Sequence, residues 1–272
     1  MHMRSIALAC LVTLSMLAGT LIPPRSGLAE PAARPAWPSH PAGTQIIHFS
    51  NYDWQVRSDT GGPGPNTWSD SNAWVDANGF LHLKITQSGG SWSCAEINTI
   101  QSLGFGTYQF DVVGPIDTLD PNVVLGLFTY PTPDVGPDGT NEIDIEFARW
   151  GSPANPNGNY TVWPTVAGNA PTSYTFNFTQ TETETIQQFQ WMPPSIAFES
   201  LPASAQVSAP LGSWLDQPSA PQLSIPQHAS PVHMNLWLFQ GQAPTDGQEV
   251  EIIIKKFTFI PSQQIYLPLL SS

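Results

Sequence analysis

The stretch "NEIDIEFARWG" at residues 141–151 decides the fold, because acidic and apolar side chains alternate in it from Glu142 to Phe147. Successive side chains of a β-strand point to opposite faces, and those two residues apart share a face. Glu142, Asp144 and Glu146 therefore lie on one face, and the apolar residues that alternate with them lie on the other. The stretch predicts a strand that covers a core on one side and presents three acids on the other.

Further short runs with strand character follow from residue 44 onward, each closed by Gly, Pro, Asn or Asp. An Asn-Gly pair in 76–80 predicts a hairpin turn. The Pro-rich stretch 200–228 predicts a long irregular connection without central strands, and no amphipathic helix of three turns stands out. The sequence thus predicts an all-β fold with two packed sheets or a closed barrel. We expect the clearest strands at 80–86, 106–113, 123–130, 142–150, 174–178, 187–192, 232–239 and 250–259.

The first residues have the pattern of a secretory signal, with a basic start, an apolar stretch and small residues before position 30. We expect residues 1–29 to be cleaved and the protein to be secreted, with no membrane attachment in the mature form. The alternative, an uncleaved anchor, is disfavoured because polar residues and glycine interrupt a stretch that is short for a bilayer span of about 20 residues. Residues 30–43 predict a Pro/Ala-rich linker, 44–260 one domain, and 261–272 a tail without an assigned role.

The charge balance excludes several classes of partner. Loss of residues 1–29 removes Arg4 and Arg25, which leaves 6 basic against 21 acidic residues and a net charge near −15. Such a surface repels nucleic acid and anionic lipid. Charged residues make up only 11% of the chain, whereas neutral polar and aromatic residues are common. This balance favours a neutral polar ligand. We also expect the protein to be a monomer.

Cysteine use argues against both disulfides and thiol chemistry. Cys10 lies in the signal, so Cys94 is the only thiol of the mature chain and an intramolecular disulfide cannot form. No histidine is near Cys94 in sequence, which favours a buried inert thiol over a catalytic nucleophile.

The three acids suit three kinds of site. A calcium site is disfavoured because calcium takes six to eight oxygens, largely from loops. A solvated acidic face is the plain alternative. The third is a carboxyl pair for glycoside hydrolysis: Cα atoms four apart on a strand are roughly 13 Å apart, and glutamates can lean until their carboxyls are about 5–6 Å apart. Retaining glycosidases need about 5–5.5 Å and inverting ones about 6.5–9.5 Å, so retention fits best without excluding inversion.

The proximity of the three carboxyls affects how many of them can be ionised. Asp144, being shorter, would lie between the two glutamates and hydrogen-bond one of them. Three carboxyls so close cannot all ionise cheaply, so the cluster should retain a proton near neutral pH. That proton would supply a general acid without a histidine and without a cofactor.

The stretch "NEIDIEF" resembles the signature strand E-x-D-x-E of glycoside hydrolase family 16. Flanking stretches resemble, in the same order, those of bacterial lichenases, and the resemblance covers most of 44–260. They are "WVDANGFLHLKIT", "WSCAEINT", "GFGTYQFDV", "GLFTY", "FQWMPPSIAF" and "MNLW".

The resemblance implies a concanavalin-like jelly-roll β-sandwich whose concave face forms the substrate cleft. It implies that Glu142 is the nucleophile, Glu146 the acid/base and Asp144 the assisting carboxylate of a retaining reaction. Aromatic rings pack against sugar rings and Asn or Tyr binds hydroxyls, although core packing is an equal alternative for any single aromatic residue. The substrate-binding candidates are Glu96, Trp92, Asn98, Phe128, Tyr130, Trp163, Asn235 and Trp237.

Departures from the lichenase pattern leave the substrate open. Thr140 and Asn141 replace the usual Trp-Asp, Asn98 replaces an Arg, and Trp163 stands in an altered stretch before Pro164. A structural calcium is unsupported, because a lysine falls roughly where an acid would help, and we predict no metal ligand. We expect a secreted endo-acting β-glucanase on a neutral polysaccharide. The alternatives are a non-catalytic glycan-binding module on the same fold and a transglycosylase, which shares the first chemical step.

Overall fold

The computed structural model describes residues 44–204 and 209–262. The predicted signal at 1–29, the linker at 30–43 and most of the tail at 261–272 lie outside the described residues. The last strand ends at Pro261, one residue beyond the predicted domain boundary.

The first sheet carries the signature strand in its interior, as the sixth of eight strands. Its neighbouring strands are all antiparallel. The order across the sheet is β1 (Ile46–Phe49), β2 (Tyr52–Val56), β8 (Ala95–Thr99), β17 (Val232–Leu238), β10 (Val123–Thr129), β11 (Ile143–Ala148), β12 (Gly158–Val162) and β13 (Thr172–Phe176).

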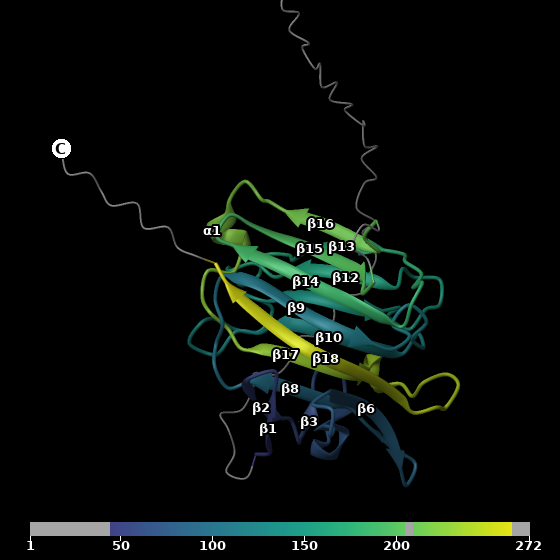
Figure 1. Ribbon diagram of the computed structural model, residues 1–272. Coiled ribbons are helices and arrows are strands. Elements are labelled where there is room, and N and C mark those ends of the chain that lie inside the picture. Colours follow the sequence, from purple (N-terminus) through teal and green to yellow (C-terminus); the bar gives the residue numbers. More distant parts are fainter. Residues whose placement is uncertain (1–43, 205–208, 263–272) are drawn as a thin grey trace, which may run out of the picture. The chain divides into compact units, whose positions relative to one another are not determined.

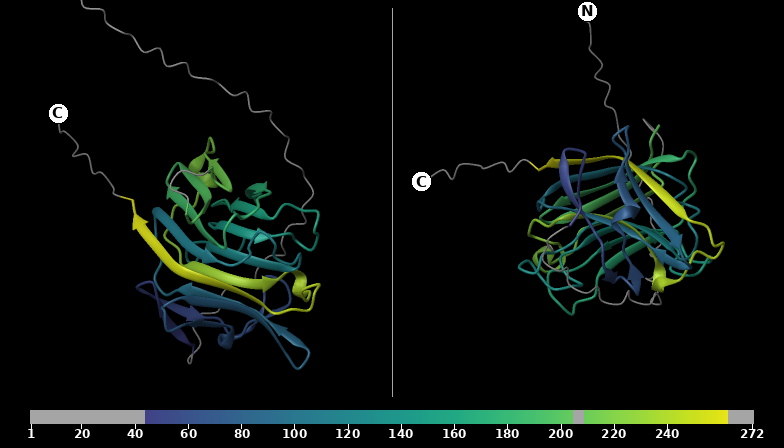
Figure 2. Two further views of the ribbon diagram at one scale, coloured as in Figure 1. Left: turned by 45° about the vertical axis from the view of Figure 1, so that its right-hand side comes forward. Right: turned by 90° about the horizontal axis from the view of Figure 1, so that it is seen from below.

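The second sheet lies in front of the first in Figure 1, and Figure 2 shows the two layers from other sides. Its order is β16 (Gly212–Asp216), β15 (Ser195–Pro202), β14 (Glu184–Met192), β9 (Gly106–Val113), β18 (Val250–Pro261), β6 (Leu81–Ser88) and β5 (Ala73–Val75), with β7 (Ser91–Ser93) paired to β6. The short elements are β3 (Thr60–Gly61), β4 (Asn66–Thr67), η1 (Asp70–Asn72), α1 (Pro221–Ser224) and η2 (Phe239–Gly241).

This arrangement confirms the predicted all-β jelly-roll sandwich, because the only α-helix among the described residues has four residues. Each expected strand is found within a few residues of its predicted range. Large side chains from the inner faces of both sheets fill the core, as alternation demands. Fully buried examples are Trp54, Tyr108, Phe147, Tyr160, Phe189 and Trp191.

The Asn-Gly turn is also confirmed. Gly79 has φ +81°, a conformation that glycine adopts without strain. The Asp76 carboxylate accepts the backbone N–H groups of Asn78 and Phe80 at 2.9 and 2.8 Å. The turn joins β5 to β6, which pair antiparallel. The alternate apolar residues of β6 are buried in the core.

Among the described residues of the Pro-rich stretch 200–228, which leave out 205–208, no central strand follows the end of β15, as predicted. It does contain β16, which sequence reasoning missed. This strand lies at the edge of the second sheet, where proline-rich flanks cost fewer ladder hydrogen bonds.

Candidate active site

The three acids lie on the outer face of the first sheet, opposite the side that covers the core. Asp144 is paired with Phe128 of β10 and Thr161 of β12, and Glu146 with Gly126 of β10 and Asn159 of β12. Glu142 precedes β11 and extends its ladder, because its carbonyl accepts the Trp163 backbone N–H at 2.8 Å.

All three carboxyls are nearly buried, although they face away from the core between the sheets. Glu142, Asp144 and Glu146 are 3%, 2% and 7% exposed. Burial of carboxylates is costly unless charge partners or hydrogen bonds compensate it. A solvated acidic face, the plain alternative from the sequence, is therefore wrong for these residues.

Trp163 contacts the middle acid. Its indole N–H donates to Asp144 Oδ2 at 2.8 Å. Hydrogen bonding to a carboxylate favours its ionised form. Sequence reasoning nominated Trp163 for a sugar ring, and the contact with Asp144 adds a role that no sequence pattern indicated.

Thr140 and Asn141, where the lichenase pattern has Trp-Asp, direct the chain into β11. Asn141 has φ +54°, a left-handed conformation that asparagine tolerates better than most residues. Its side chain donates to Thr140 Oγ1, and that hydroxyl donates to the carbonyl of Pro137 at 2.7 Å. Both residues are buried, so in this chain they shape the loop that sets Glu142 in place.

Glu96 belongs to a buried charged network on the same face. Arg57 donates to its Oε2 at 2.9 Å, and His233 Nδ1 lies 3.1 Å from its Oε1. His233 was missed by sequence reasoning, but parity could have found it, because it lies two residues before Asn235 on β17. Asn98 is paired directly with His233, so it also lies on this face.

Two candidate aromatic residues line the same row as the acids. The Phe128 ring stacks on His233 with centroids 5.0 Å apart, and its neighbour Tyr130 donates its hydroxyl to Asp138 at 2.7 Å. Both rings are buried but lie outside the core cluster between the sheets. They are thus placed with the acids and not in the inter-sheet core.

Asn235 and Trp237 share the outward parity of β17 and carry buried polar atoms, although the Trp237 ring, unlike Phe128 and Tyr130, also belongs to the hydrophobic core cluster. Neither amide atom of Asn235 nor the indole nitrogen of Trp237 has a hydrogen-bond partner among the described residues. Buried polar groups normally have partners, and unsatisfied ones are costly. Asn235 lies beside Gly126, where an added Cβ would come within 2.5 Å of its Oδ1. The face therefore holds donors and an acceptor that a hydroxylated ligand could satisfy.

Trp92 was nominated for substrate binding together with Glu96, on the assumption that "WSCAE" is one continuous strand, but it does not lie on the face of the acids. It lies on β7, which pairs with β6 of the second sheet, and it packs partly against the core. The chain leaves that sheet at Cys94, so the alternation along "WSCAE" does not continue through one strand. Trp92 therefore belongs to the packing of the fold.

Cys94 is buried, and burial raises the pKa of its thiol to about 12. It is therefore inert, as predicted. Among residues 44–204 and 209–262, no cluster of three or more His, Cys, Asp or Glu side chains could hold a metal ion. The described part of the chain also has no helix long and apolar enough to cross a membrane.

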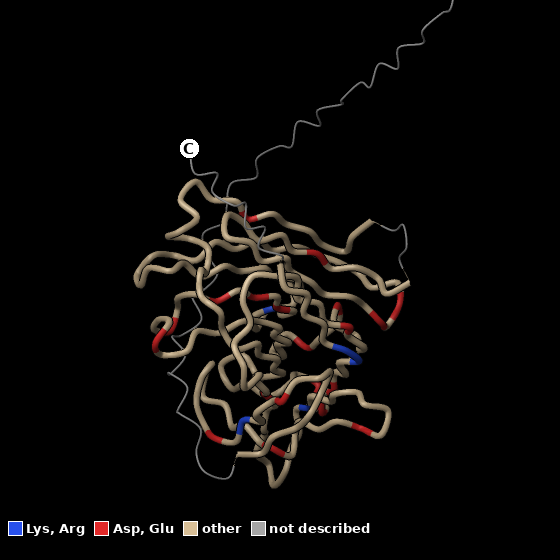
Figure 3. The backbone as a smooth tube through the Cα atoms, turned by 60° about the vertical axis from the view of Figure 1, so that its left-hand side comes forward, with Lys and Arg blue, Asp and Glu red and all other residues tan. Residues whose placement is uncertain are grey.

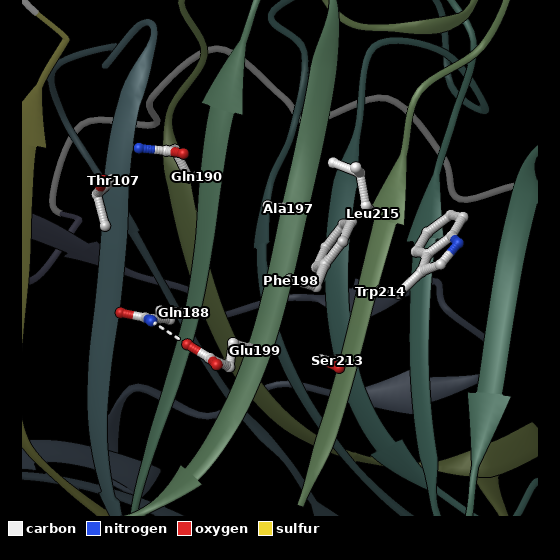
Figure 4. Close-up of a pocket in the computed structure, with 9 residues that line it drawn as sticks. All are labelled: Thr107, Gln188, Gln190, Ala197, Phe198, Glu199, Ser213, Trp214 and Leu215. Atoms are coloured by element: carbon white, nitrogen blue, oxygen red, sulfur yellow. Dashed lines mark hydrogen bonds between the residues drawn. The ribbon is translucent and has the colours of Figure 1, made fainter. Parts of the chain in front are cut away.

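Acidic segments outnumber basic ones along the described backbone, as Figure 3 shows. A separate hollow of about 620 Å³ lies on the second sheet and is drawn in Figure 4. Its only acid, Glu199, accepts a hydrogen bond from Gln188 at 2.8 Å. With one carboxyl it lacks the pair that glycoside hydrolysis needs. The lining residues are Thr107, Gln188, Gln190, Ala197, Phe198, Glu199, Ser213, Trp214 and Leu215.

Comparisons with known proteins agree on the fold. No protein-family model matches the chain, and no curated protein matches it. Among solved structures, a Bacillus licheniformis β-glucanase has a TM-score of 0.57 at 22% identity, covering 82% of this chain and 100% of that one. A Bacteroides ovatus family 16 protein of mixed-linkage glucan utilisation, in complex with a product, has a TM-score of 0.60 at 14% identity, covering 76% and 94%.

A third neighbour is described as an immunostimulatory antigen and pseudo β-1,3-glucanase of Mycobacterium tuberculosis. It has a TM-score of 0.58 at 20% identity, covering 77% of this chain and 91% of that one. At these identities the likeness shows the fold. The chain therefore has a fold like that of the family 16 β-glucanases, as the resemblance implied.

Proposed function

We propose that the protein is a secreted, endo-acting, retaining glycoside hydrolase that cleaves a neutral polysaccharide, a β-glucan. The observation that carries the proposal is the row of three buried acids on one outer face, beside buried polar atoms of Asn235 and Trp237. The β-glucanase neighbours of the same fold support the substrate class. The acidic, charge-poor composition supports a neutral ligand.

The mechanism follows from the row. Glu142 attacks the anomeric carbon while Glu146 protonates the departing glycosidic oxygen, which leaves a glycosyl ester on Glu142. Glu146, now ionised, removes a proton from water, and the oxygen of that water displaces Glu142 from the sugar. Two inversions give net retention. Asp144 between them assists Glu142, and no metal or cofactor takes part in either step.

The first test is a substrate panel. Protein collected from the medium of cells that express the full chain should release reducing ends from mixed-linkage glucan, laminarin or xyloglucan. Glu199→Gln, which changes the acid of the hollow on the second sheet, serves as the control and should keep full activity. Failure to cleave any of the three polymers, or loss of activity in the control as well, would contradict the proposal.

Two alternatives are separated by the same panel. A glycan-binding module would bind a polymer without cleaving it, and the pseudo-glucanase among the neighbours makes that outcome worth measuring. A transglycosylase would form the same intermediate but transfer the sugar to a second chain, so polymer length would redistribute with little gain in reducing ends. Neither alternative is favoured by a specific contact in this structure.

A further inference from the structure

The contact between Trp163 and Asp144 joins the row of acids to the neighbouring strand. Trp163 extends β12 and lies opposite Glu142, to whose carbonyl its backbone N–H donates at 2.8 Å. Its indole crosses diagonally to Asp144 Oδ2, also at 2.8 Å. The side chain thus touches the middle acid while its backbone fixes the first.

The indole ring of Trp163 packs at a defined position beside the loop that precedes β11. Its six-membered part lies against Gly139, because a Cβ added there would be 3.7 Å from Trp163 Cζ3. Gly139 has φ +74°, where most other residues are strained. The loop before β11 therefore leaves room for the indole, and the N–H is held in the direction of Asp144.

An indole N–H is a donor only, so it can satisfy a carboxylate oxygen but cannot accept a proton from a carboxylic acid. The partner it favours is the ionised form of Asp144. Three neighbouring carboxyls disfavour full ionisation, so the position of the retained proton matters for the reaction.

We propose that Trp163 is a positioning residue that holds Asp144 fixed and ionised, so that the proton of the row remains on the glutamates. This inference rests on the proposed function and names how that site assigns its proton. The nucleophile must be ionised and the acid/base protonated for the first step. A proton held on Asp144 would not be available to protonate the leaving group.

Other charged groups face Asp144 from the elements packed around it. Glu142, directly before β11, and Glu146, on β11, flank it along the chain, and both raise the cost of its charge. His233 lies two strands away in the same row, across Phe128, and is paired with Glu96, which also binds Arg57. Trp163, directly after the end of the adjacent strand β12, donates to Asp144 from the side away from that network.

The kinetic test replaces Trp163 with Phe, which keeps a ring and removes the donor. Loss of a hydrogen bond to a charged group predicts a fall in kcat of about 10- to 100-fold, with KM changed less than about 2-fold. The acid limb of the pH profile of kcat/KM should move to higher pH, because Asp144 then takes up its proton more readily. Trp74→Phe, on the second sheet where Trp74 stacks on His82, is the matched control and should change neither quantity.

A raised KM with an unmoved acid limb would overturn the proposal, because it would make Trp163 only a wall for a sugar ring. Because Phe is smaller than the indole, it would not fill the space that Trp163 occupies against Gly139. A second variant therefore carries 3-benzothienylalanine at position 163, which keeps the shape and replaces N–H by sulfur. It should reproduce the shift of the acid limb, and wild-type behaviour of this variant would also overturn the proposal.

A measurement that needs no activity separates this proposal from the proposed function. The indole proton of Trp163, assigned in a ¹H–¹⁵N spectrum by its loss in Trp163→Phe, should lie downfield and titrate with pH. In Asp144→Asn most of that titration should disappear. An indole resonance that does not titrate, or titrates equally in Asp144→Asn, contradicts the contact whether or not the protein cleaves glucan.

Discussion

The outer faces of the two sheets differ in how far their polar residues are buried. Strands β6, β9, β14 and β15 of the second sheet alternate between buried residues and partly exposed ones. Strands β10, β11, β12 and β17 of the first sheet are buried at every position, so their outward acids and amides are buried too. Solvation stabilises the polar side chains of the second sheet at no cost, whereas the first sheet holds charge where it is expensive. Such expense is typical of functional sites.

The sharpest way to break the comparison is to neutralise one acid on each face. Glu142→Gln or Glu146→Gln should lower kcat by about 10⁴-fold, as expected for members of a catalytic unit. Glu199→Gln on the second sheet should change kcat less than about 2-fold, because that acid is partly exposed and bonded to Gln188. Initial rates on the best polymer of the panel give both values. Equal activity of either site variant and wild type would remove that glutamate from the mechanism.

A smaller effect tests the buried amide of the first face. In Gly126→Ala the new Cβ would come within 2.5 Å of Asn235 Oδ1 and must displace it. We expect kcat/KM to fall about 10-fold, with a loss of stability of about 1–3 kcal/mol from overpacking. Gly104→Ala is the control, because its Cβ would meet only the Ala229 Cβ at 3.8 Å. Full activity of Gly126→Ala would mean that Asn235 does not bind the substrate.

The smallest expected effect is a change in stability from a buried acid that takes no part in the proposed mechanism. Asp216 of β16 is 6% exposed, its Oδ2 has no hydrogen-bond partner among the described residues, and burial raises its pKa above 3.8. A raised pKa means that ionised Asp216 destabilises the fold above its folded-state pKa and that this penalty is absent below 3.8. Asp216→Asn should therefore raise Tm by about 2–4 °C at pH 7, for a gain of about 1 kcal/mol.

Thermal melts across pH check that prediction. The gain should shrink as pH falls through the folded-state pKa of Asp216 and vanish in strong acid, where the wild-type carboxyl is neutral. A gain that is independent of pH would show that the charge of Asp216 is not its cause.

Much of the fold follows from alternation along single strands. The row of Glu142, Asp144 and Glu146 opposite apolar residues is a local pattern, so its placement on one face could be predicted. The same parity extends to Asn235 and Trp237 on β17. Such patterns are visible because the period of a strand is two residues.

Contacts between strands could not be predicted in this way. The donation from Trp163 to Asp144 depends on the direction of one side chain across a strand pair. The network of Arg57, Glu96 and His233 joins three distant parts of the chain. Trp92 was misplaced because nothing in "WSCAE" marks the point at which the chain passes from one sheet to the other.

The central claim is that Glu142 and Glu146 cleave a glycosidic bond by double displacement. The most direct test is the anomeric configuration of the first product, followed by proton NMR on the best polymer before mutarotation equilibrates it. Double displacement on a β-glucan predicts that the new reducing end appears first as the β-anomer. Initial release of the α-anomer would contradict the account. An equilibrium mixture of both anomers at the first time point would also contradict it, provided that the reaction is faster than mutarotation.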